Sequence, residues 1–410
     1  MDATQLHHPL LPSITLSPRS GIGPDQTAVL AVLLSPHLRA ERDRRGLAQA
    51  QLVQAGLLPN PTIGYTRDFV TGGNTAGTVS AYGFTGSWDI SSIVSHEAKV
   101  KAARANVDAI SLDVGWTEWQ TAEGAKLAFY RVLALEAQLN RAKQIDDDQQ
   151  ATVATLQSAV DRHEKSVIDL AAAQATQQDA FATVLGLEQE LDQKRLALKK
   201  AIGFFPEARL PIRDDFVLPS SISVPSEPEL LSNLENRRLD LVGLRQGYQS
   251  QEETVRAAIL AQFPKVSLGF SRASDNTNVH STGFGITIDL PIFDRNQGAI
   301  ATEKATRQKL YDEYVNRVFE AHSDIAAALS DIRSLREQIT AAQAALPVLQ
   351  RLVDTAKSAS DEGAADVLGY FQARTNLNQK SLQILKLKQQ LVEAKSALEL
   401  ASGRYLPASN

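Results

Sequence analysis

The histidines of this chain are the first residues to test for chemistry, because imidazoles bind metals and transfer protons near neutral pH. They stand at positions 7, 8, 37, 96, 163, 280 and 322. No two of them are spaced as a pair of metal ligands on one helix, and His96-Glu97 lacks the second histidine of a zinc-protease motif. The chain has no cysteine, which excludes disulfides, thiolate metal sites and a cysteine nucleophile. These residues predict no enzyme, no metal site and no cofactor.

Acidic residues are the second group that could take part in chemistry. They gather near the two points where the long helical patterns must turn. The first point carries Asp161, Glu164 and Asp169, and the second carries Asp361, Glu362 and Asp366. Ser166 and Asp366 are suited to cap the helices that follow. The simplest interpretation of both groups is a solvated helix tip with capping acids. The aspartate run 146–148 lies within a helical pattern and is interpreted as a solvated face.

The composition indicates a folded protein, since hydrophobic residues make up 43% of the 410 positions and charged residues 22%. The net charge is −5 and no basic stripe with interleaved aromatic residues is present, so nucleic-acid binding is not expected. No apolar run approaches the roughly 20 residues of a membrane-spanning helix. Asp2 and a proline-rich stretch stand where the basic region of an export signal is expected, so no export signal is visible. Hydropathy indicates a soluble protein unless β-strands cross the membrane, because their signal is weaker.

Two halves of nearly equal plan follow one another along the chain. The aligned segments are 58–65 with 263–270, 83–90 with 283–290, and 202–205 with 402–405. The last two pairs share an offset of 200 residues. A proline-rich joint over 206–228 separates the halves. We therefore expect the same succession of elements twice.

Each half opens with two segments that alternate between apolar and small polar residues, which predicts a β-hairpin with two unlike faces. Phe284, Ile286 and Ile288 share one face of the second hairpin, and Phe84 and Trp88 take the corresponding face of the first. The opposite face carries glycine, threonine and aspartate. The pattern fits a soluble hairpin with one buried face. It equally fits strands with one face in lipid and the other in a water-filled lumen.

Each hairpin is followed by a helical pattern long enough for a helix of about 100 Å at 1.5 Å per residue. In the second half, apolar residues recur every seven positions over 318–353, and a second series, mostly alanine, follows three positions behind over 321–356. This spacing predicts a coiled-coil seam. The first half keeps the register, except that Asp146 and Gln149 interrupt it. Pro347 is expected to kink or loosen the helix that contains it.

The predicted fold class is mainly α with a small β part: long antiparallel coiled-coil helical hairpins plus four β-strands per chain. Four strands cannot close a barrel. An open sheet with an apolar outer face leaves the backbone groups of both edge strands unpaired and the apolar side chains of that face uncovered. The chain is therefore expected to oligomerise.

Three segments, together with the repeat over 22–405, carry a resemblance to a known family. The segment 55–61 (AGLLPNP) precedes the first strand, 289–298 (DLPIFDRNQG) follows the fourth, and 362–374 holds the second helical turn. In their order and spacing they resemble the outer-membrane efflux protein family, which is TolC-like. The resemblance is nearer to the branch of the family that exports metals and drugs with RND pumps.

The resemblance implies a homotrimer whose chains contribute four strands each to a 12-stranded β-barrel in the outer membrane, with an α-helical tunnel through the periplasm. It implies a passive duct that carries small solutes, metal ions or drugs, from an inner-membrane pump and a periplasmic adaptor protein to the exterior. It places Phe84, Trp88, Phe284, Ile286 and Ile288 against outer-membrane lipid. The exported substrate, the cognate pump and the state of the gate are left open.

In such a duct, threefold symmetry repeats each acid of the helix tips as a ring, and rings of carboxylates favour cations in a narrow pore. The candidate gate residues are Asp161, Glu164, Asp169, Asp361, Glu362 and Asp366. Tyr370 and Arg374, just beyond the second tip, are candidates for bonds to neighbouring helices that hold the gate shut. In a duct, the aspartate run 146–148 has a second interpretation, which is that it lines the lumen.

The resemblance and the repeat together divide the chain into seven segments. They are an N-terminal extension with the first helix (1–58), the first β-hairpin (59–92), the first long helical hairpin (93–205), a linker with a helix (206–258), the second β-hairpin (259–291), the second long helical hairpin (292–405) and a tail (406–410). The alternative to a duct is a coiled-coil scaffold or a periplasmic adaptor without a channel. An adaptor has one helical hairpin within its β-structure, whereas this chain has two tandem repeats.

Overall fold

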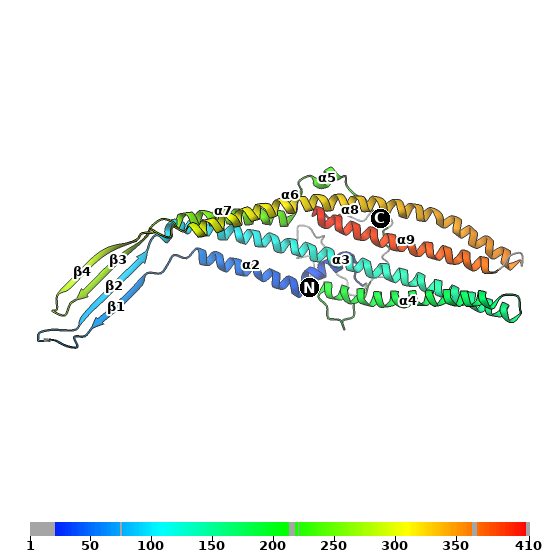
Figure 1. The fold of residues 1–410 in the computed structure, drawn as a ribbon, viewed down its shortest axis with the longest axis horizontal. Coiled ribbons are helices and arrows are strands. Elements are labelled where there is room, and N and C mark those ends of the chain that lie inside the picture. Colours follow the sequence, from blue (N-terminus) through cyan, green and yellow to red (C-terminus); the bar gives the residue numbers. More distant parts are fainter. Residues whose placement is uncertain (1–20, 74–75, 213–217, 220, 363–366, 407–410) are drawn as a thin grey trace. The chain divides into compact units, whose positions relative to one another are not determined.

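A computed structural model describes residues 21–73, 76–212, 218–219, 221–362 and 367–406 (Figure 1). The elements are α1 (Pro24–Leu34), α2 (Pro36–Ala55), β1 (Thr62–Asp68), β2 (Ala81–Asp89), α3 (Ser92–Asp161), α4 (Val167–Ile202), α5 (Glu227–Leu231), α6 (Leu234–Arg237), α7 (Leu239–Leu260), β3 (Lys265–Ser274), β4 (His280–Asp289), α8 (Gln297–Asp361) and α9 (Val367–Ser402). They form two compact units. One contains residues 1–39, 115–238 and 319–410, and the other contains 40–114 and 239–318.

The two halves of the chain match in structure as they do in sequence. The helices α4 and α9 each have 36 residues, and they begin at positions 167 and 367, which keeps the offset of 200. Gly203 and Gly403 follow these helices with φ values of 92° and 60°. Glycine adopts this left-handed conformation without the strain that a side chain would cause. The predicted succession of a β-hairpin and a long helical hairpin, present twice, is confirmed.

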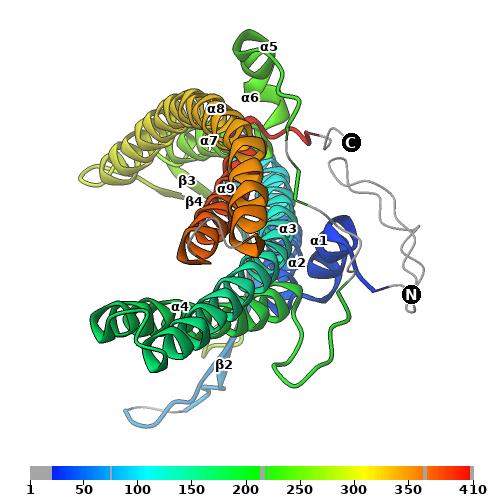
Figure 2. The ribbon, with the colours of Figure 1, turned by 90° about the vertical axis from the view of Figure 1, so that its right-hand side faces the viewer.

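Two helical hairpins make up most of the first unit, and their heptad positions form its cores. Ile325, Ile332 and Leu391 are buried between α8 and α9, and Val132 and Leu191 are buried between α3 and α4. Figure 2 shows the two pairs of helices from the side of their turns. The 70 residues of α3 correspond to about 105 Å at 1.5 Å per residue. The coiled-coil prediction is confirmed.

Short elements of the first unit cover these hairpins at the level of the joint between the halves. Leu30 of α1 packs on the core of α3 and α4, while Leu230 and Leu234 from α5 and α6 join the core of α8 and α9. Ile22 forms a parallel bridge with Ile212. The helix α8 continues through Pro347.

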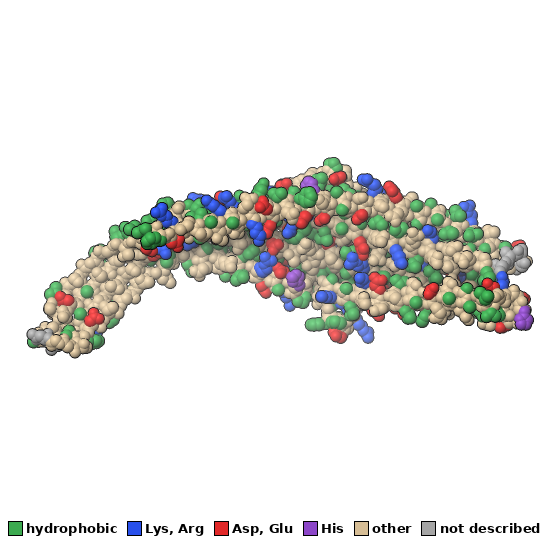
Figure 3. Space-filling model, in the orientation of Figure 1, with side chains coloured by type: hydrophobic (Ala, Val, Ile, Leu, Met, Phe, Trp, Pro, Cys, Tyr) green, Lys and Arg blue, Asp and Glu red, His purple; other side chains and the backbone are tan. Residues whose placement is uncertain are grey.

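The second unit holds a four-stranded antiparallel sheet in the order β1-β2-β3-β4. Its register brings Trp88, Leu268 and Ile286 into one row across three strands. The same alternation places glycine beside threonine on the other face, as with Gly64 opposite Thr85. In Figure 3 the sheet shows mostly backbone and uncharged polar side chains on the visible face. The prediction of two unlike faces is confirmed.

The apolar face of the sheet is exposed within a single chain. Phe284 is 87% exposed, and Ile286, Ile288 and Phe84 are also exposed, while Trp88 is half-buried and donates its indole N–H to the Pro59 carbonyl at 2.9 Å. This unit therefore does not bury the face itself. In the same unit, the Ser250 hydroxyl of α7 donates to a backbone carbonyl of α3 at 2.8 Å. Among the described helices, none is both long and apolar enough to cross a membrane.

Candidate functional site

The tip of the first helical hairpin is built from helix-capping contacts. The Ser166 hydroxyl accepts a backbone N–H of the first turn of α4 at 3.0 Å, and the Asp169 carboxylate accepts the Ser166 N–H at 3.3 Å. Asp161 accepts a hydrogen bond at 2.9 Å from a glutamine one turn earlier, and Glu164 pairs with Arg162 at 3.0 Å. The hydrogen bond from Arg162 lowers the pKa of Glu164. All three acids are exposed to water, and among them Asp169 takes part in the cap of α4.

The second tip is equivalent in position, since α8 ends at Asp361 and α9 begins at Val367. Glu362 is exposed there. The side chain of Asp361 and the whole of Asp366 lie outside the described residues. Whether Asp366 caps α9 as Ser166 caps α4 therefore stays a prediction.

An ion pair joins the two hairpins one to two turns beyond the second tip. The Arg374 Nη2 atom of α9 lies 2.6 Å from Asp148 Oδ1 of α3, and the Asn378 amide donates to Asp148 Oδ2 at 2.6 Å. Arg374 also donates to the Tyr370 hydroxyl at 3.3 Å. The Asp148 side chain is 4% exposed and that of Arg374 43%. Arg374 thus bonds a neighbouring helix directly, whereas Tyr370 contacts Arg374 on its own helix.

The prediction of a solvated face for the aspartate run of α3 is wrong for two of its three residues. Asp146 and Asp148 are buried, and Asp147 alone is exposed. The reason is that α3 has neighbours on two sides. Asp146 accepts from Gln177 of α4 at 3.0 Å, while Asp148 meets α9. The interruption of the heptad register at Asp146 and Gln149 was the signal, because a buried seam position occupied by a polar residue requires a polar partner.

The buried carboxylate of Asp148 depends on Arg374 to compensate its charge. Burial raises the pKa of Asp148, and Asp147 raises it further, while Arg374 and Asn378 lower it. The net direction is upward, so burial outweighs the favourable contacts. Losing the guanidinium would leave a buried carboxylate without its main compensating charge, which favours either protonation or exposure to water.

A second set of ionisable side chains, which the sequence did not predict, is buried where α3 and α9 meet the C-terminal segment. The Lys126 Nζ atom lies 3.0 Å from Glu123 Oε1 and 4.2 Å from the centre of the Tyr405 ring. Lys395 Nζ lies 3.7 Å from Glu399 Oε1, which also accepts a backbone N–H of the C-terminal segment at 2.7 Å. Burial and the nearby Glu123 raise the pKa of Glu399 to about 8, against the effect of the two lysines. This set ties the C-terminal segment to the helices.

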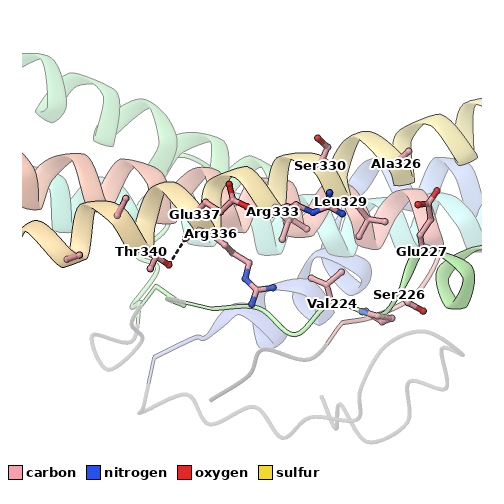
Figure 4. A pocket seen from close by; sticks show the side chains of 14 residues that line it. Val224, Ser226, Glu227, Ala326, Leu329, Ser330, Arg333, Arg336, Glu337 and Thr340 are labelled. Carbon is pink, nitrogen blue, oxygen red and sulfur yellow. Dashed lines mark hydrogen bonds between the residues drawn. The ribbon is translucent and has the colours of Figure 1, made fainter.

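A groove of about 910 Å³ runs along α8 beside residues 224–227 (Figure 4). Its lining contains Arg333, Arg336 and Glu337 among alanines and serines, and it has no histidine. Figure 4 shows Arg336 reaching from α8 toward the segment that carries Val224. Among the described residues, no group of three or more histidine, aspartate and glutamate side chains could hold a metal ion.

Solved structures of other proteins match the fold over nearly the whole chain. The crystal structure of CusC matches with a TM-score of 0.76 at 19% identity, over 99% of this chain and 97% of that chain. The outer membrane protein VceC from Vibrio cholerae matches with a TM-score of 0.75 at 17% identity, over 93% and 96% of the two chains. These likenesses show the fold.

The sequence comparisons are more specific. The chain is 24% identical over 399 residues to the pyoverdine export outer membrane protein OpmQ of Pseudomonas aeruginosa, across 91% of this chain and 83% of that protein. It is 26% identical over 251 residues to the cation efflux system protein CusC of Escherichia coli, across 59% of this chain and 54% of that protein. A family model described as outer membrane efflux protein matches residues 28–204 and 230–404. The chain belongs to the outer membrane efflux protein family.

Proposed function

We propose that this chain is the outer-membrane channel component of a tripartite efflux system, a passive trimeric duct and not an enzyme. The observation that carries the proposal is the sheet, whose apolar face is exposed and whose strands β1 and β4 lie at its two edges. Unpaired strand edges are not tolerated in hydrocarbon, so copies of the chain must close the sheet in the membrane. In the closed assembly the exposed face, with Phe284 and Ile286, contacts lipid. The long helical hairpins extend the duct toward a periplasmic adaptor and an inner-membrane pump.

The cargo class proposed is small solutes, either metal ions or drug-like molecules. Two relatives are named for pyoverdine export and for cation efflux, and both match in sequence. Among the described residues of this chain, no cluster of three or more ligating side chains could bind a metal ion. We assign selection of the cargo to the pump.

The purified protein is expected to require detergent, to have the mass of a trimer by native mass spectrometry and to form ion-conducting pores in planar bilayers. Closure of the apolar sheet between copies is the physical reason for all three properties. A protein that stays monomeric and soluble without detergent would instead support a coiled-coil scaffold.

We propose further that the helix tips gate the duct. The contacts between Arg374, Tyr370 and Asp148 hold the second hairpin against the first, and the acids at the tips, Asp161, Glu164, Asp169, Asp361, Glu362 and Asp366, form rings by symmetry. The support is the ion pair between α3 and α9 and the exposure of the acids at the first tip. Rings of carboxylates in a constriction attract cations and repel anions.

The Asp366→Ala variant is expected to reduce the preference of the pore for cations about twofold to fivefold, because it removes one carboxylate ring from the constriction. Reversal potentials in a salt gradient across a planar bilayer measure this preference. Glu207→Ala is the matched control, since Glu207 is an exposed acid in the joint between the halves. Equal selectivity in wild type and Asp366→Ala would remove this residue from the gate.

A further inference from the structure

The apolar face of the sheet, which carries Phe284, becomes basic where the strands lead into their turns. The register places Arg67 of β1 beside Tyr82 of β2 and extends this row to His280 of β4. In the adjacent row, Arg272 of β3 lies between β2 and β4. Side chains two positions apart on a strand share a face, so both arginines belong to the apolar face. Two guanidinium groups and an imidazole therefore mark this end of the face.

The two faces of the sheet separate the charged side chains by sign. In the four strands, all of whose residues the structure describes, the apolar face carries arginine and histidine but no carboxylate. The strand carboxylates, Asp68, Asp89 and Asp289, all lie on the opposite face. Lys265 lies on that opposite face as well. Within the sheet, no acid on the apolar face compensates the positive charge of the arginines.

Both guanidinium groups are open to a ligand from outside the chain. Arg67 and Arg272 are exposed, and neither forms an ion pair with any residue that the structure describes. The guanidinium carbon of Arg67 lies 5.3 Å from the centre of the Phe69 ring, a contact that orients the group and leaves its charge in place. Asp275, which follows β3 directly, accepts two backbone N–H groups of its own loop at 2.8 and 2.9 Å. This acid is therefore engaged in the turn and not with an arginine.

Toward the middle of the strands, the same face is aromatic. Tyr65 is 63% exposed and Phe84 is 41% exposed, and both share the row of Arg272. Phe270 and Phe284 form the next row, with ring centres 5.5 Å apart. The face thus passes from exposed aromatic rings to guanidinium groups over two neighbouring rows. An anionic lipid has the same order of polarity, since apolar chains end in a charged headgroup.

We propose that this face of each chain binds a phosphate-bearing lipid of the outer leaflet, with the phosphate groups on Arg67 and Arg272 and the acyl chains along the aromatic rows. The guanidinium fork suits this ligand, because it donates two parallel hydrogen bonds to phosphate oxygens. The strands β1 and β3 are two strand spacings apart, about 10 Å, so a lipid with two phosphate groups can contact both arginines. A soluble anion would leave the aromatic rows uncovered.

The assignment to the outer leaflet rests on the proposed function. The helices join the sheet at the strand ends 62, 89, 265 and 289, so the arginines lie at the opposite ends of the strands. In the proposed duct those ends face the exterior. Tyr82 and His280 lie in the same row, with the tyrosine hydroxyl 3.5 Å from the imidazole Nδ1 atom. Tyrosine is enriched where a membrane meets water, which places this row at the level of lipid headgroups.

Native mass spectrometry of the delipidated trimer in detergent tests the proposal. The probe is lipid A, a glucosamine lipid with two phosphate groups, and the wild-type trimer is expected to bind one copy per chain. Arg67→Gln with Arg272→Gln is expected to bind it at least about tenfold more weakly, because two charge-assisted contacts are lost. The matched control, Lys265→Gln with Lys304→Gln, removes two exposed lysines from the same unit and is expected to bind as the wild type does. If the double arginine variant forms no trimer, the two single variants decide, and each is expected to lose about threefold in affinity.

Two further probes separate a lipid site from other causes of binding. Digalactosyl diacylglycerol, an uncharged glycolipid, is expected to bind weakly and equally to the wild type and the double arginine variant. Inorganic phosphate in excess is expected not to displace lipid A, because it makes no contact with the aromatic rows. Equal affinity of both proteins for lipid A, or displacement by inorganic phosphate, would overturn the proposed lipid site and leave the trimer intact. A wild-type protein that forms no trimer would contradict the proposed function instead.

Discussion

In planar bilayers, the Arg374→Ala variant is expected to conduct at least about twofold more current than the wild-type duct, because it removes the ion pair that joins α9 to α3 near the tips. Asp148 is buried, and burial already raises the pKa of its carboxyl group. Without the guanidinium this carboxyl group loses its compensating charge, and the hydrogen bond from the Asn378 amide is its remaining contact with α9. Since Arg374 is 43% exposed, the loss is about 1–3 kcal/mol per chain, less than for a fully buried pair.

Arg195→Ala is the matched control for this measurement. Arg195 pairs with Glu136 at 2.8 Å, but both residues belong to the first hairpin, so the link between the hairpins stays intact. Asp148→Asn removes the same ion pair from the other side and should also raise the conductance. Folded Arg374→Ala trimers with wild-type conductance would show that this ion pair does not hold the duct closed.

Lys126→Met is expected to destabilise the protein by about 3–5 kcal/mol, because it leaves the buried carboxylate of Glu123 without its ion-pair partner. Glu123 is 1% exposed, and Lys126 is its ion-pair partner at 3.0 Å. Burial opposes the charge of Lys126, yet Glu123, Glu399 and Tyr405 raise its pKa, so the lysine is charged in the folded protein. The midpoint of thermal unfolding of the detergent-solubilised trimer measures the effect.

Two further variants complete the test: an exposed ion pair serves as the control, and a substitution of Glu399 tests the pH dependence. Lys101→Met removes an exposed pair with Glu97 and should lower the unfolding midpoint far less than Lys126→Met does. Glu399→Gln removes the acid whose pKa folding raises to about 8. Because the folded chain keeps this proton after the unfolded chain has lost it, the free energy of unfolding falls as the pH rises from about 4.5 to about 8. The slope should weaken in Glu399→Gln, and equal midpoints for Lys126→Met and Lys101→Met would show that the set is not a stabilising one.

The repeat and the heptads made most of the fold predictable from sequence, because each is a local pattern. An offset of 200 places both turns, and the type of residue at 166 predicts a cap that the structure shows. The alternation around Phe284 predicts the faces of β4 for the same reason, since side chains on a strand alternate with a period of two.

The polar contacts between hairpins were not predictable, because the heptad pattern describes one packing face of a helix and α3 has two. Asp148 therefore looked like one of three solvated acids until α9 supplied Arg374 and Asn378. The set around Lys126 was missed for a related reason. Its partners, Glu399 and Tyr405, lie more than 270 positions away in the chain, and no pattern within α3 encodes them.

A solute that passes along the glycine, serine and threonine face of the sheet meets backbone and hydroxyl groups between the ends of the strands. Larger side chains do not fit there without displacement, since a Cβ atom built on Gly64 or Gly83 would lie 2.7 Å from the hydroxyl of Thr85 or Thr66. Between the strand ends this face carries no charged side chain, whereas Asp68, Asp89, Lys265 and Asp289 lie on it at the ends of the strands. In the proposed duct, a solute in the middle of the sheet is therefore held by no ionic contact, and charged side chains meet it only at the two ends of the strands.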